Sequence, residues 1–131
     1  MILIFEKYNK LSWLITILLT LLIFYMSSLT FLPAVSVSFD IKSTAYHFLV
    51  FFWLAFFLLI SLIKGNINNK RTNLFIYGLI FVLLYSISDE IHQLFVPGRF
   101  CSLTDILIDS IGIFLATLIY LNSFKTTFTQ A

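Results

Sequence analysis

The residues most able to do chemistry are gathered in one short segment of the chain, residues 86–112. This segment holds four of the six acidic residues of the 131-residue chain, together with a histidine and an arginine. At helical spacing, its polar side chains form one narrow face before the Pro97-Gly98 pair and a second face after it. Carboxylates on adjoining faces can bind a polar ligand, hold a metal ion or act as a general base. The first face comprises Ser86, Asp89, Glu90 and Gln93, and the second comprises Ser102, Asp105 and Asp109.

The rest of the chain is far more apolar than a soluble domain. It is 60% hydrophobic and 11% charged, with a mean hydropathy of +1.03, which is typical of a membrane protein. An aspartate at mid-membrane costs about 2.5–3.5 kcal/mol. The acidic segment therefore requires a water-filled cleft, compensating cations or carboxyl groups that remain protonated. Arg99 is the nearest cation in the sequence, and its forked guanidinium is predicted to pair with Asp89 or Glu90.

Charge and cysteine content exclude several classes of protein. The net charge of +2 is too small to indicate a nucleic-acid-binding protein, and no basic stripe is interleaved with aromatic residues. Cys101 is the only cysteine in the sequence. The chain therefore has neither an internal disulfide nor a metal cage built from thiolates.

Four apolar stretches have the length of about 20 residues that a helix needs to cross a membrane. They lack the alternating pattern of barrel strands, and only helices or closed barrels satisfy the backbone in lipid. We therefore predict an all-α membrane protein, a single domain over residues 1–131 that forms a bundle of four transmembrane helices. The predicted helices cover about 11–32, 45–63, 73–96 and 103–121. The second of them is expected to serve as lipid-facing and packing surface.

The basic residues predict how these helices are oriented. Six of the eight precede the first helix, separate the second from the third, or follow the fourth. The other two, Lys42 and Arg99, lie on the opposite side. By the positive-inside rule, both termini are cytoplasmic, and the polar hairpin between helices three and four faces outward from the cell membrane. A cleaved signal peptide ending near "LPAVSVS" is the alternative, but the apolar run is long for a signal core.

The "VPGRF" turn predicts how the two polar faces meet. A turn this short makes the third and fourth helices antiparallel neighbours. If it centres near Arg99, Gln93 is level with Asp105 and Asp89 is level with Asp109. Each inner acid then lies roughly 10–15 Å along its helix from the turn.

The polar segment admits several interpretations. It can be a binding site for a polar headgroup, glycan or peptide, or an ion-pair cluster that only fixes helix register. A metal site would use Asp89, Glu90, His92 and Asp105 and would suit Mg²⁺ or Mn²⁺. The spacing matches no metal signature, so no metal ligand or cofactor is assigned.

An enzyme is disfavoured and no catalytic residue is assigned, because no Ser-His-Asp order, phosphate loop or nucleophile motif is present. A transporter-like proton relay would require the short helices to form a homo-oligomer. The candidate ligand-binding residues are Asp89, Glu90, Gln93, Arg99, Ser102, Asp105, Asp109, His47 and Lys42.

The order of these residues resembles the VanZ-like membrane proteins, a family associated with low-level resistance to the glycopeptide teicoplanin. The resemblance rests on Asp89-Glu90-x-x-Gln93, followed by Pro97-x-Arg99, Ser102 and the "DILIDSIG" segment. Ser27-Ser28, Lys42 and His47-Phe48 are similar to the family as well.

The resemblance implies a multi-pass protein of the cell membrane that is linked to the cell envelope. The expected function is to bind an envelope precursor, a lipid headgroup or a glycopeptide in an outward-facing pocket of carboxylates and arginine. Such binding would give low-level tolerance to teicoplanin-type glycopeptides. A small membrane enzyme that acts on an envelope lipid or glycan is the alternative.

Overall fold

The computed structural model describes residues 8–30, 41–64 and 69–128, with the side chains of 41–42, 69–70 and 124–128 outside that description. Over these ranges every regular element is an α-helix. The helices are α2 (Asn9–Ser27), α3 (Ile41–Ile63), α4 (Asn69–Gln93) and α5 (Leu103–Phe128). Each of the four is long and apolar enough to cross a membrane. The predicted all-α fold with four helices of membrane-spanning length is therefore confirmed in this part of the chain, with α2 ending at Ser27 rather than near residue 32.

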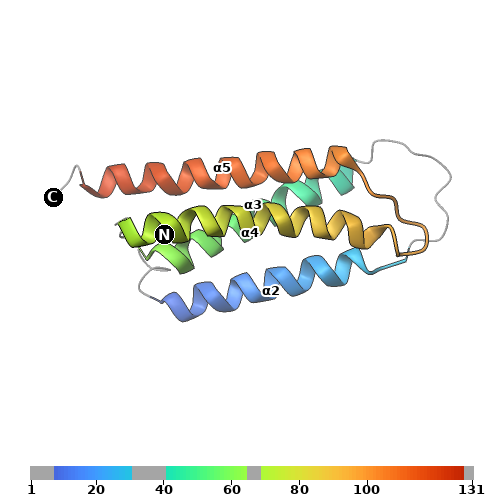
Figure 1. Cartoon of the computed structure of the whole chain (residues 1–131), viewed down its shortest axis with the longest axis horizontal. Coiled ribbons are helices and arrows are strands. Elements are labelled where there is room, and N and C mark those ends of the chain that lie inside the picture. Colours follow the sequence, from blue (N-terminus) through green and yellow to red (C-terminus); the bar gives the residue numbers. More distant parts are fainter. Residues whose placement is uncertain (1–7, 31–40, 65–68, 129–131) are drawn as a thin grey trace.

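The four helices run alternately up and down along one long axis (Figure 1). α3 and α4 lie between α2 and α5, and the α4–α5 turn is at the same end as the C-terminal end of α2. α3 packs against each of the other helices, and its interface with α5 is the most extensive in the bundle. The polar residues near the start of α3 therefore come beside those at the end of α4 and the start of α5.

α3 is the central helix of the bundle, so the packing part of its expected role is confirmed, while Leu49 and Trp53 keep it partly exposed. In its spanning segment 61% of the residues are buried, against 22% in α2. Its sequence is apolar on every face, and a helix without a polar face can be covered by neighbouring helices on all sides. Its side chains form most of the hydrophobic core, including Phe51, Leu54, Ala55, Leu59 and Ile60.

The outer helices present large apolar side chains outward. Leu21 is 59% exposed on α2, Leu84 is 60% exposed on α4, and Phe114 is 63% exposed on α5. Exposed apolar surface on this scale requires an apolar solvent, which lipid provides. The inner face of α2 is instead small and polar, with Ser12 and Thr16 buried, and small residues of this kind let membrane helices approach closely.

The turn between α4 and α5 sets the register of the polar faces. The Arg99 N–H donates to the Val96 carbonyl oxygen at 3.1 Å, and Gly98 has a φ of 81°. Pro97 followed by a left-handed glycine is the pair that a type II turn favours. The turn therefore centres between Pro97 and Gly98, not at Arg99. This difference shifts the pairing of the two helices by nearly one turn.

Candidate functional site

Three buried ionisable side chains from three different helices meet between α3, α4 and α5. His47 is 2% exposed, and Glu90 and Asp109 are completely buried. The His47 Nδ1 and Asp109 Oδ1 atoms lie 3.2 Å apart, within hydrogen-bond distance. The His47 Nε2 atom faces Glu90 Oε1 at 3.9 Å. His47 thus joins the carboxylates of α4 and α5 from its position on α3.

Asp109 is held on its second oxygen by a serine. The Ser86 hydroxyl donates to Asp109 Oδ2 at 2.6 Å, and Ser86 is completely buried. The expectation that Asp89 would be level with Asp109 is therefore wrong, because the turn centres earlier than Arg99. Sequence reasoning placed Ser86 on the polar face but did not assign it to the site. Its position one turn before Glu90 on that face was the signal for including it.

Glu90 is fixed by both neighbouring segments. The Ser102 backbone N–H donates to Glu90 Oε2 at 2.8 Å, and the Gln93 amide donates to Glu90 Oε1 at 3.3 Å. Ser102 also caps α5, because its hydroxyl accepts from the Asp105 N–H at 3.2 Å. A carboxylate at this helix N-terminus is favoured by the helix dipole. The structure thus explains why a serine follows the turn and why Gln93 follows Glu90 at a spacing of three.

Asp89 lies on the side of the site nearest α2. It is 7% exposed and accepts a hydrogen bond from the Gln93 amide at 3.1 Å. The Ser27 hydroxyl lies beside the Asp89 carboxyl, although it has no partner of regular hydrogen-bond geometry. Gln93 therefore links the two adjacent acids, and α2 closes the site through Ser27.

Arg99 is directed toward α2. Its Nη2 donates to the Met26 carbonyl oxygen at 3.0 Å. The ion pairs that the structure gives to Glu90 and Asp109 both involve His47. The pairing of Arg99 with Asp89 or Glu90 stays a prediction. Lys42, the other cation proposed for the site, has a side chain outside the described residues.

Three residues offer the geometry of a metal site. A ring nitrogen of His47 and one carboxylate oxygen each from Glu90 and Asp105 lie within 4.8 Å of one another. This set differs from the one considered from the sequence. His92 instead contacts the Ser28 hydroxyl at 3.1 Å and the ring of Phe24, so it lies on the α2 side of the bundle.

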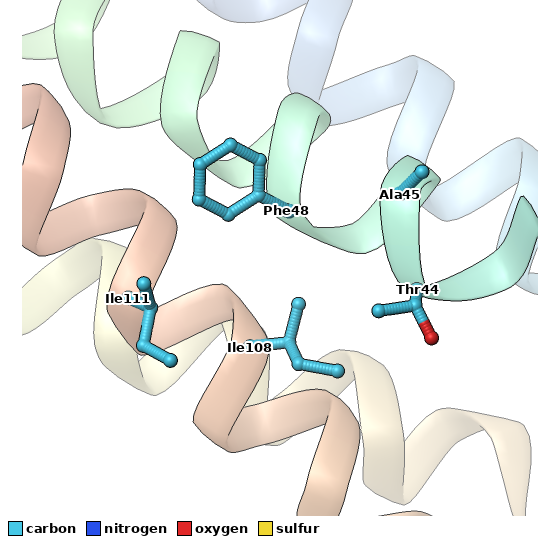
Figure 2. Close-up of a pocket in the computed structure, with 5 residues that line it drawn as sticks. All are labelled: Thr44, Ala45, Phe48, Ile108 and Ile111. Atoms are coloured by element: carbon cyan, nitrogen blue, oxygen red, sulfur yellow. The ribbon is translucent and has the colours of Figure 1, made fainter. Parts of the chain in front are cut away.

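An apolar groove of about 320 Å³ lies along the seam between α3 and α5. Figure 2 shows side chains of the first turns of α3 facing side chains of α5 across this groove. None of the ionisable residues of the site lines it. Its lining residues are Thr44, Ala45, Phe48, Ile108 and Ile111.

The bundle is thus a multi-span membrane protein with a polar site buried between three of its helices. The site offers carboxylate oxygens and an imidazole nitrogen, so it can accept hydrogen bonds, bind a cation or transfer protons. The model of the VanZ/LLP1 family matches residues 2–125, and the chain belongs to that family. No match was found among curated proteins or among solved structures.

Proposed function

We propose that this VanZ/LLP1 protein binds a polar group of an envelope lipid, envelope precursor or glycopeptide at the site between α3, α4 and α5. In this proposal the protein lies in the cell membrane with both termini cytoplasmic and the site near the outer surface. Binding there gives low-level tolerance to teicoplanin-type glycopeptides. The observation that carries the proposal is the concentration of buried carboxylates at one end of a bundle whose outer surface is apolar.

The donor and acceptor content of the site favours one class of ligand. Asp89, Glu90, Asp105 and Asp109 are all acceptors when ionised, whereas His47 contributes at most one further donor beside Asp109. Such a site is best matched by hydroxyl or amine groups, which sugars, peptides and glycopeptide antibiotics all carry. Asp105 is half-buried, so it is the member of the site that a ligand reaches first.

The orientation of the bundle can be tested at its single cysteine. Cys101 is exposed and lies in the α4–α5 connection, which in this proposal faces outside the cell, as the distribution of basic residues favours. We expect a membrane-impermeant maleimide to label Cys101 in intact cells, or in spheroplasts if an outer membrane is present. Labelling only after rupture of the inner membrane would reverse the assignment, provided that a cysteine introduced at Phe100 is also labelled only after rupture.

The functional proposal can be tested by drug susceptibility in a sensitive Gram-positive host. We expect expression of the wild-type protein to raise tolerance to teicoplanin, and Glu90→Gln to remove the increase because it replaces a buried carboxylate that two donors hold. Ser88→Ala, at an exposed position on the same helix, should behave as wild type. Membrane levels are matched by blotting. Equal tolerance in the wild-type and Glu90→Gln strains would remove the polar site from the explanation.

A further inference from the structure

We propose that His47, Glu90 and Asp105 form a binding site for one divalent transition-metal ion. This inference goes beyond the proposed function, because it concerns an ion that binds in the absence of any envelope ligand or drug. It rests on the convergence of three ligand atoms from three helices within 4.8 Å. It also rests on the surrounding hydrogen bonds, which leave a lone pair on the His47 Nε2 atom.

The hydrogen bonds around His47 determine what its second nitrogen can do. An ionised Asp109 can only accept, and its Oδ1 lies 3.2 Å from His47 Nδ1, so the proton of a neutral imidazole belongs on Nδ1. Nε2 then carries a lone pair inside a side chain that is 3% exposed. Within the part of the chain that the structure describes, this atom has no hydrogen-bond donor, and its ion-pair contact is Glu90 Oε1 at 3.9 Å.

Three electron-rich atoms therefore face one another in the interior of the protein. The Nε2 lone pair and the carboxylate oxygens of Glu90 and Asp105 repel one another unless a positive charge lies among them. A proton held by Nε2 or by one of the carboxyl groups is one such charge, and a metal ion is the other. The arrangement favours the metal because a single proton can bond to only one of the two carboxylates, whereas an ion can contact all three atoms.

The contacts that fix the His47 ring match those around metal-binding histidines in known sites. A histidine that binds a metal through one nitrogen usually donates its other N–H to a carboxylate or carbonyl, which fixes the ring and its tautomer. Asp109 has this position relative to His47, and the Ser86 hydroxyl fixes Asp109 in turn at 2.6 Å. Asp109 and Ser86 are therefore positioning residues for the proposed ligand His47.

The three atoms lie near enough for small side-chain movements to bring them to the spacing of bound ligands. With metal–nitrogen and metal–oxygen distances of about 2.0–2.2 Å, neighbouring ligand atoms are roughly 3–3.5 Å apart. The 3.9 Å between Nε2 and Glu90 Oε1 has to contract by well under 1 Å, and the pairs that involve Asp105, which lie within 4.8 Å, by up to about 1.8 Å. One imidazole and two carboxylates suit Mn²⁺ or Zn²⁺ better than Ca²⁺, which takes oxygen ligands alone.

The site also has an open side. His47 and Glu90 are buried, whereas Asp105 is half-buried at the start of α5. Three protein ligands with one accessible side leave a coordination position for water or for a ligand group, as in metal sites that do more than stabilise a fold. The ion would reach the site past Asp105.

Metal binding can be measured directly on the purified full chain in detergent. Mn²⁺ is titrated into metal-stripped protein and followed by the loss of the free-ion electron paramagnetic resonance signal. We expect about one ion per chain and weakening of binding by at least tenfold in His47→Gln and in Asp105→Asn. His92→Gln is the matched control, because this histidine contacts Ser28 instead, and it should bind as wild type does.

A second measurement identifies the nitrogen ligand. Electron spin-echo modulation of bound Mn²⁺ should show coupling to one ¹⁴N nucleus in the wild type and in His92→Gln, and Asp105→Asn should keep this coupling at saturating Mn²⁺. Because Asp105 is half-buried, its variant remains informative if His47→Gln does not fold. Absence of saturable binding, absence of ¹⁴N coupling, or equal loss of affinity in His92→Gln and Asp105→Asn would each overturn the site. The drug-tolerance experiment is independent of all three results.

Discussion

Replacing Gly112 with alanine is expected to destabilise the bundle by roughly 3 kcal/mol, because no space exists for even one methyl group. A Cβ built on Gly112 would lie 2.6 Å from the Phe48 carbonyl oxygen and 3.3 Å from the Phe52 backbone nitrogen. Both atoms belong to the backbone of α3, so they move only if the helix moves. Since the α3–α5 interface is the most extensive in the protein, separating these helices affects the whole bundle.

Gly78→Ala provides a matched control on α4. A Cβ at Gly78 would meet Leu62 Cδ1 at 2.7 Å, and this atom is the end of a flexible side chain that can change rotamer. Both glycines are within helices, so alanine adds the same gain in helix propensity of about 1 kcal/mol at each position. The comparison therefore isolates the helix contact. Unfolding of the detergent-solubilised proteins in SDS, followed by circular dichroism, should show a large loss for Gly112→Ala alone. Equal stability of the two variants would mean that α3 and α5 do not pack at Gly112.

The same change should disturb the polar site. His47 immediately precedes Phe48 on α3, and Asp109 lies one turn before Gly112 on α5. The hydrogen bond between His47 and Asp109 is thus next to the point of closest approach between the two helices. The glycine at the packing contact thus sets the distance between two residues of the site.

The sequence predicted the helices and their polar faces because both depend on local patterns. Long apolar stretches with few charges specify membrane-crossing helices whatever surrounds them. The spacing of Glu90 and Gln93, and of Asp105 and Asp109, places each pair on one side of its helix in any arrangement. The structure confirms the four helices, and these acids do lie on faces that meet.

The register and the role of α3 depended on information that no local pattern contains. A shift of the turn centre from Arg99 to the Pro97-Gly98 pair changed the partner of Asp109 from Asp89 to Ser86. Arg99 is the nearest cation along the chain, yet the histidine of α3 is the residue that contacts both Glu90 and Asp109. Its position follows from which helices pack together, and apolar composition alone does not determine that.

Removing the Asp109 carboxylate is expected to destabilise the protein by about 3–5 kcal/mol, since its buried partners would lose their acceptor. In Asp109→Leu, the His47 Nδ1 and the Ser86 hydroxyl would each face an apolar side chain. Asp105→Leu is the matched control, one turn away on the same helix but half-buried. It should cost less than about 1 kcal/mol, because a half-buried charge is still partly solvated. The measurement is again SDS unfolding of the detergent-solubilised proteins.

A double-mutant cycle separates a specific His47–Asp109 interaction from general loss of packing. Replacing both residues with leucine removes the donor and the acceptor together, and apolar pairs of suitable volume are tolerated where half of a buried polar pair is not. We expect His47→Leu/Asp109→Leu to be more stable than the sum of the single variants predicts, with a coupling energy of about 2 kcal/mol. Additive effects would mean that Asp109 does not hold the imidazole. In that case Nε2 would no longer be fixed toward Glu90 and Asp105, and the orientation on which the proposed metal site depends would be lost.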